Sequence, residues 1–179
     1  MSLPRITTVA YVTLLLSGAA VADTITVGPG LDAETLPDAL PLAADGDELA
    51  IASGTWSPSA PDEAVLHLTN RQLTIRALDP ETPPVFDGGA TGRAMVIDGG
   101  SIVLQDLLLV GGSVIGSDLN GDGVTSDWEQ SGGVVTVSSA AVTMQACSMT
   151  GGSAFHGGCL GAWYSDIALN NCTISGGMA

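Results

Sequence analysis

The chain of 179 residues contains no lysine, and four arginines are its only strongly basic side chains. Nineteen acidic residues oppose them, which gives a formal net charge of −15. We expect no nucleic-acid partner, because phosphate contacts need lysine and arginine. Such a surface also repels anionic membranes and acidic polysaccharides unless a cation bridges them. Solubility alone would equally explain the acidic excess.

Long apolar runs are also missing. The candidate VAYVTLLL, residues 9–16, is shorter than the roughly 18 residues that a membrane-spanning helix needs. Arg5 precedes it and the small residues AVA follow, a pattern that predicts a secretory signal peptide over residues 1–22. We therefore expect cleavage before Asp23 and a mature chain 23–179 that is secreted or held at the cell surface, with no membrane insertion.

Glycine, in contrast, is abundant, with 24 residues. Three segments of 19 residues, 94–112, 134–152 and 159–177, align without a gap, and each ends in Gly-Gly. Apolar and polar columns alternate along the alignment, which is the period of a strand. The clearest columns are Ile102, Val142 and Ile167; Leu104, Met144 and Leu169; the amides Gln105, Gln145 and Asn170; and Leu109, Met149 and Ile174.

A repeat of this size predicts a solenoid. The step of 25 residues between the last two segments suits one turn of a parallel β-helix, and a partial unit at 65–77 precedes them. Stacked turns lie roughly 4.8 Å apart and place inward side chains in ladders. We expect an all-β, right-handed parallel β-helix, since parallel crossovers are right-handed. The alternative is chance alternation in a glycine-rich β-sandwich.

Several stretches also resemble known families. They are TITVGPG (24–30), Gly46-Asp47, Gly54-Thr55-Trp56, and the repeat openings SGGVV (131–135) and HGGCL (156–160). Together they are similar to pectin-lyase-like right-handed parallel β-helix proteins, and the repeat openings resemble the polymorphic outer-membrane protein repeat. The resemblance implies a short N-terminal helix that caps the first turn, which Pro41 would break or shorten. It specifies fold better than activity.

The first step of the repeat is 15 residues longer than the second, and the excess falls within residues 113–133. This insertion contains SDLNGDGVTSDWEQ, which has the spacing of an EF-hand calcium loop, including the glycine of its sharp turn. Its oxygens suit calcium, a hard cation that takes six to eight of them. The predicted ligands are Asp118, Asn120, Asp122, Val124 through its carbonyl, Ser126 and Glu129. We interpret the loop as a structural calcium clip, with a solvated acidic turn as the alternative.

Catalytic residues remain unknown at this stage. Lyases of the resembled family use calcium with a basic residue, commonly arginine, as proton abstractor; the candidates here are Arg71, Arg76 and Arg93. Both histidines, His67 and His156, are expected at the surface.

Adjacent aromatic residues, Trp163 and Tyr164, are expected at a turn, where they can contact a glycan or pack against a neighbouring loop. The cysteines are expected to be free thiols. Cys147 and Cys172 share a column, so their side chains run parallel and disfavour a disulfide. Cys159 falls in an inward apolar column.

Two functions follow from this pattern. The first is a non-catalytic β-helix module for adhesion, whose partner would be a polysaccharide or cell-surface glycan. The second is a polysaccharide lyase or hydrolase, or the N-terminal part of one, since the chain stops just where a new turn would begin. The few basic residues favour the first.

Overall fold

The computed structural model describes residues 22–60, 63–114, 118 and 121–179. Strands dominate these residues, and they form two sheets in which every pairing is parallel. The larger sheet has the order β1 (Thr24–Val27), β2 (Glu48–Ile51), β4 (Ala64–Ala77), β6 (Arg93–Gln105), β8 (Val135–Gln145) and β10 (Leu160–Trp163), with β11 (Asp166–Asn170) also paired to β8. The smaller sheet has the order β12 (Thr173–Ser175), β9 (Ser148–Thr150), β7 (Leu108–Val110), β5 (Val85–Asp87) and β3 (Thr55–Trp56). The predicted all-β class is therefore present.

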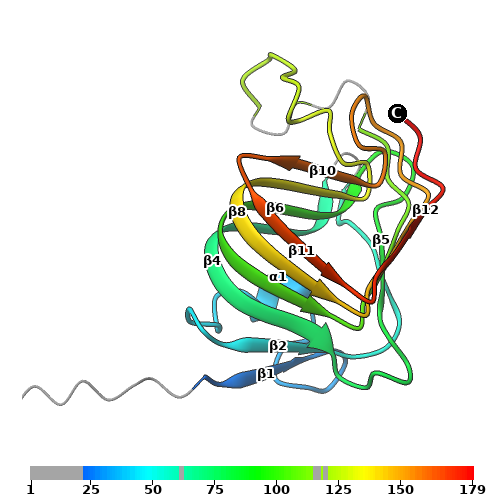
Figure 1. Ribbon diagram of the computed structural model, residues 1–179. Coiled ribbons are helices and arrows are strands. Elements are labelled where there is room, and N and C mark those ends of the chain that lie inside the picture. Colours follow the sequence, from blue (N-terminus) through cyan, green and yellow to red (C-terminus); the bar gives the residue numbers. More distant parts are fainter. Residues whose placement is uncertain (1–21, 61–62, 115–117, 119–120) are drawn as a thin grey trace, which may run out of the picture.

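From β2 onward the chain passes from one sheet to the other and back (Figure 1). β4, β6 and β8 follow one another in the larger sheet, while β5, β7 and β9 alternate with them in the smaller one. Parallel neighbours cannot be joined by a tight hairpin and need a crossover connection. Here the strand of the opposite sheet is part of each crossover, so residues near each other in space come from successive passes of the chain.

The strand register agrees with the sequence alignment. Ile102 pairs with Val142, and Val142 pairs with Ile167. The amide column is in register too, and Gln105 Nε2 donates to Gln145 Oε1 at 3.4 Å. The columns read from the sequence are therefore neighbours across the sheets.

The core lies between the two sheets and is built from alternate residues of each strand. In β4, Leu66 and Leu68 are buried while His67 between them is exposed, as expected. Phe86 in β5 and Leu109 in β7 have no exposed surface and supply the opposite wall. Burial of such side chains from water is the main favourable contribution to folding.

A corner recurs in the long strands of the larger sheet. Asn70, Gly99, Ser139 and Tyr164 fall at equivalent register positions, and all have φ between 49° and 75°. This left-handed region is uncommon for residues other than glycine, and asparagine is among the residues best suited to it. A second corner repeats in the same way at Asp106, Ala146 and Asn171, with φ between 51° and 55°. Each pass of the chain therefore bends at the same places.

The N-terminal end is closed by local structure. Helix α1 (Leu36–Ala39) starts at Thr35, whose side chain accepts from the backbone N–H of Asp38. It buries Leu36 and ends ahead of Pro41, as the position of that proline predicts.

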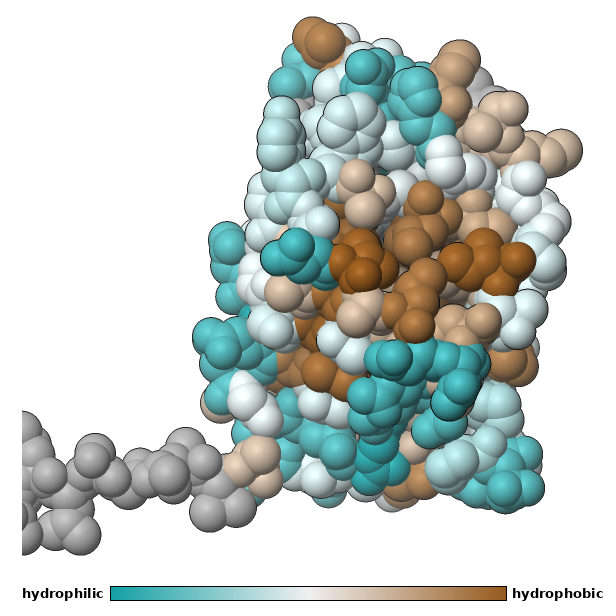
Figure 2. Space-filling view, viewed as in Figure 1, coloured by the Kyte–Doolittle hydropathy of each residue, from teal (hydrophilic) through white to brown (hydrophobic). Residues whose placement is uncertain are grey.

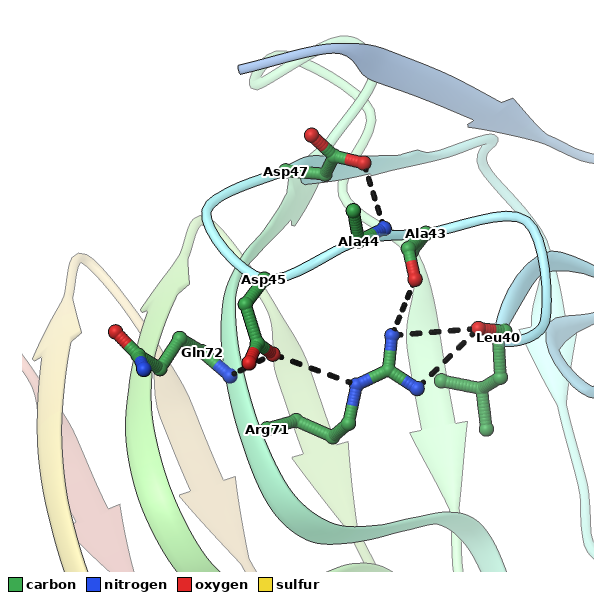
Figure 3. A network of polar contacts seen from close by, with 7 residues as sticks. All are labelled: Leu40, Ala43, Ala44, Asp45, Asp47, Arg71 and Gln72. Carbon is green, nitrogen blue, oxygen red and sulfur yellow. Dashed lines mark hydrogen bonds and ion pairs between the residues drawn. The ribbon is translucent and has the colours of Figure 1, made fainter. Parts of the chain in front are cut away.

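Arg71, on β4, holds the segment that follows α1 (Figure 3). Its guanidinium donates to the carbonyls of Leu40, at 3.3 Å, and Ala43, at 2.6 Å, and its Nε lies 3.8 Å from Asp45 Oδ1. Asp47 accepts from the backbone N–H of Ala44 at 2.7 Å, which closes the turn into β2. This network ties the amino-terminal end to the body of the protein.

The opposite end exposes apolar side chains. Leu169 in β11 is 42% exposed and Ile174 in β12 is 44% exposed, whereas Leu104 and Met144 in the Leu169 column have no exposed surface. Figure 2 shows apolar side chains gathered on the face that β11 and β12 border. The difference arises because each of these last strands has a neighbour on one side only within the described chain.

Candidate functional site

The insertion between β7 and β8 leaves and rejoins the body at neighbouring positions. Ser113 forms a parallel bridge with Ser153, and Ser131 forms one with His156. Ser113 and Ser131 are 18 residues apart, while their partners are three apart, so the insertion adds the 15 residues that the alignment predicts. It projects beyond the ends of the strands (Figure 1). Of the predicted calcium ligands, Asn120 lies outside the described residues.

In the described part of the predicted calcium loop, carboxylates accept hydrogen bonds from nearby backbone N–H groups. Asp118 accepts from the backbone N–H groups of Gly121, at 2.9 Å, and Gly123, at 2.8 Å. Asp122 accepts from the N–H of Val124 at 2.8 Å. Gly123 has φ of 82°, as the sharp turn at this position requires. Asp122 and Val124 are exposed and Asp118 is half-buried, and their oxygens are chemically suited to a hard cation.

Glu129, the last predicted ligand, is in a different environment. It has no exposed surface, and its Oε2 accepts from the backbone N–H of Ser126 at 2.8 Å and from the hydroxyl at 2.6 Å. The bond from the Ser126 N–H to the Glu129 carboxylate is one half of a capping box, Ser-x-x-Glu, at the turn 127–130, while the Glu129 N–H donates to the Ser126 backbone carbonyl at 3.1 Å. Ser126 and Glu129 are thus bonded to each other.

Arg93, at the start of β6, reaches the same turn from the body. It is 2% exposed, and its Nη2 donates to the backbone carbonyl of Glu129. Burial lowers the pKa of Arg93 to about 10, and the attraction of the Glu129 charge opposes that shift. We refer to this hydrogen bond and charge attraction as the Arg93–Glu129 contact. It attaches the insertion to the strands through a buried side chain.

Sequence reasoning missed this contact, although two signals for it were present. Ser126-Asp127-Trp128-Glu129 has the capping-box spacing. Arg93 stands immediately before the first aligned segment, where the other two segments have Gly133 and Gly158. A large cation in a glycine column indicates a local partner, but the alignment does not say which residue it is.

Some of the predicted ligands in the loop suit calcium, and one does not. The donor types of Asp118, Asp122 and Val124 suit the ion, but Glu129 is buried beside Arg93 and bonded to Ser126. Across the described residues, no group of three or more His, Cys, Asp or Glu side chains is placed to hold a metal. The chemistry of the loop therefore fits calcium, while the position of Glu129 does not fit a bidentate ligand.

A hollow of about 240 Å³ lies where the insertion meets the strands, lined by Asp127, Trp128, Ser138, Trp163 and Tyr164. Trp163 is half-buried, and its Nε1 donates to Ser131 Oγ at 3.0 Å. Its ring also meets that of His156 edge-on, with centroids 6.4 Å apart. Trp163 therefore packs against the insertion, one of the two outcomes expected for it.

Tyr164, in contrast, does not pack against a neighbouring loop in this way. Its side chain is 93% exposed, and its φ of 49° places it at the recurring corner. Trp128, which the sequence reasoning did not connect with the aromatic pair, comes from the insertion and lines the same hollow. Three aromatic side chains thus gather from two regions of the chain. The sequence distance between them explains why only the adjacent pair was predicted.

The other arginines proposed as bases are engaged in the body. Arg71 holds the carbonyls that follow α1, as described above. Arg76 Nη2 lies 2.7 Å from Glu48 Oε1, and its Nη1 donates to the carbonyl of Ala77 at 2.8 Å. These contacts give Arg71 and Arg76 a structural role. His156 is exposed, as expected.

The three cysteines are free thiols. Cys147 and Cys159 are buried, as predicted, and burial raises the pKa of Cys147 to about 11. Cys172 is only half-buried because it belongs to the last pass of the chain. Buried thiols with raised pKa values act as small apolar side chains rather than as nucleophiles.

No helix in the described part of the chain is both long and apolar enough to cross a membrane. No protein-family model, curated protein or solved structure matches the chain.

Proposed function

We propose that this protein is a non-catalytic module that contacts a glycan through the hollow between the insertion and the strands. The observation that carries this proposal is the gathering of Trp128, Trp163 and Tyr164 around one hollow, with Tyr164 93% exposed. Aromatic faces offer a large apolar area at a small cost in side-chain entropy, and the apolar face of a sugar ring can stack on them. Tyr164 places a bulky aromatic residue at the corner where other passes of the chain have Asn70, Gly99 and Ser139, and such a residue is uncommon at positive φ.

We further propose that the scaffold is a right-handed parallel β-helix of the pectin-lyase-like kind. Three features support this: successive strands alternate between two parallel sheets, the amide column is in register, and the same corners recur at positive φ. The hand follows from the preference of parallel crossovers.

Secretion or surface display remains part of the proposal and rests on the signal-peptide pattern. Residues 1–21 lie outside the described part of the chain.

Calcium binding by the insertion also remains a proposal, as a structural clip for a segment rich in carboxylates. Asp118, Asn120, Asp122 and the Val124 carbonyl would be its ligands. Glu129 would join them only by exchanging its hydrogen bonds with Ser126. The ion would supply positive charge to the exposed acidic turn.

The lyase or hydrolase alternative has less support. Lyases of the resembled pectin-lyase-like family use calcium with an arginine as the base. In this chain Arg71 and Arg76 are engaged in backbone and acidic contacts of the body. We therefore propose glycan contact, and not polysaccharide cleavage, as the function.

The test is a titration of the full chain with neutral, amino and uronic oligosaccharides, followed by tryptophan fluorescence and calorimetry. Tyr164→Asn removes the aromatic ring but keeps the backbone, since asparagine already occupies this corner at position 70, with φ of 51°. We expect the variant to fold like the wild type and to bind at least about tenfold more weakly, equivalent to about 1.4 kcal/mol.

The control is Leu42→Asn, because Leu42 is 58% exposed at the other end of the molecule. It should bind like the wild type. Failure of every saccharide to bind, or unchanged binding by Tyr164→Asn, would refute the proposal.

A further inference from the structure

We propose that the hollow selects a protonated amine, so that its ligand is an amino sugar with a free ammonium group, of the glucosamine type. This inference rests on the proposed glycan contact and goes further by naming the class of sugar. The juxtaposition that carries it is a carboxylate among aromatic rings: Asp127 lines the hollow with Trp128, Trp163 and Tyr164.

The geometry of the lining supports an ammonium ligand. A cation over the face of tryptophan or tyrosine is attracted by the ring quadrupole. The carboxylate of Asp127 adds a charged acceptor at the same place, and charge-assisted hydrogen bonds are stronger than neutral ones. Asp127 also has a fixed backbone, because its carbonyl accepts from Ser131 Oγ at 2.6 Å, and the same hydroxyl accepts from the indole N–H of Trp163. The backbone of Asp127 and the indole of Trp163 are therefore positioned by one shared serine.

The charge around the hollow also favours an ammonium ligand. Asp98 is the register neighbour of Ser138, which lines the hollow, and it adds a second carboxylate to this face. The chain has no lysine, and Arg71 and Arg76 are engaged elsewhere in the fold. Arg93 is buried against the backbone carbonyl of Glu129, in the turn that carries Asp127, and it does not line the hollow. A uronic acid would therefore meet repulsion here, whereas an ammonium group is attracted. The negative field of the whole chain adds long-range steering.

The size of the hollow favours a sugar over a basic peptide. At about 240 Å³ it falls below the usual range for ligand pockets, roughly 300–1,000 Å³, and suits one ring rather than a chain segment. Two other hollows, of about 230 and 190 Å³, have only uncharged residues in their described linings. Charge and aromatic character thus coincide at this hollow.

The experiment compares three trisaccharides on the full chain by calorimetry: β-1,4-linked glucosamine, its N-acetylated form and galacturonate. We expect the free-amine trimer to bind at least about tenfold more tightly than the acetylated one, and the galacturonate to bind most weakly. Raising the salt concentration should weaken the free-amine binding, because exposed charges are screened within about 10 Å at 0.1 M.

Asp127→Asn should reduce binding of the free-amine trimer about tenfold while leaving the acetylated trimer unaffected, since the change keeps size and removes charge. Glu34→Gln, at an exposed site near α1, makes the same change in net charge and should have no effect. Melting temperatures of both variants confirm that they fold.

The outcomes separate this inference from the proposed function. Equal binding of the acetylated and free-amine trimers, or unchanged binding by Asp127→Asn, overturns the amine and leaves the glycan contact standing. No binding by any trimer overturns both. Trilysine bound as tightly as the free-amine trimer overturns the sugar and assigns the hollow to basic peptides.

Discussion

The strands and the insertion are held in different ways. In the strands, each pass of the chain is bonded to the next through backbone groups in register, and apolar columns such as Leu104 and Met144 fill the interior. The insertion is joined to them by bridges at Ser113 and Ser131 and by the Arg93–Glu129 contact. The strands depend on a repeated pattern, and the insertion depends on a few contacts with distant residues such as Arg93 and Trp163. The candidate binding hollow lies where the two meet.

The largest effect is expected from breaking the Arg93–Glu129 contact. Glu129→Ala leaves the buried Arg93 without its opposite charge, which should cost about 3–5 kcal/mol in the free energy of unfolding. Replacing both residues, Arg93→Met with Glu129→Leu, should recover most of that loss, since an apolar pair needs no compensation. Urea unfolding of the two variants measures it. A double variant as unstable as the single one would show that charge is not the cause.

A smaller effect is expected within the apolar columns, and it should depend on position. Leu104→Ala removes a fully buried side chain and should cost about 2–5 kcal/mol. Leu169→Ala, in the same column but 42% exposed, should cost less than half as much. Similar losses at both sites would mean that the end bordered by β11 and β12 is covered in solution.

The smallest effect is expected from calcium, which acts only on the insertion. Binding should be weak, with a dissociation constant of roughly 10⁻⁴ to 10⁻³ M, because the loop has no flanking helices. A tenfold excess over that constant would stabilise the fold by about 1.4 kcal/mol. Asp122→Asn should weaken binding more than Ser126→Ala, since Asp122 is an exposed charged ligand while the Ser126 hydroxyl is bonded to Glu129. A melting temperature indifferent to calcium and to chelator would leave the acidic turn without a metal.

The difference between the strands and the insertion explains which features could be predicted from the sequence. Alternation and glycine spacing predicted which residues share a column, because strand period and stacking are local, repeated properties. The recurring corners at positive φ were not predicted, since Ser139 and Ala146 carry no signal for that conformation. Arg93 and Glu129 are 36 residues apart, so their contact depends on the fold. The grouping of Trp128 with Trp163 and Tyr164 also depends on the fold and could not be predicted from the sequence.

The most direct test of the account is to remove the insertion. Deleting residues 115–129 joins Val114 to Gln130 and leaves Ser-Val-Gln-Ser, the length of the equivalent connection Ser-Ala-Phe-His at residues 153–156. Arg93→Ala is included because its partner is lost. The measurements are urea unfolding and calorimetry with the amino trisaccharide. We predict a single cooperative transition and a complete loss of saccharide binding. A variant that fails to fold, or one that still binds the trisaccharide, would contradict the account.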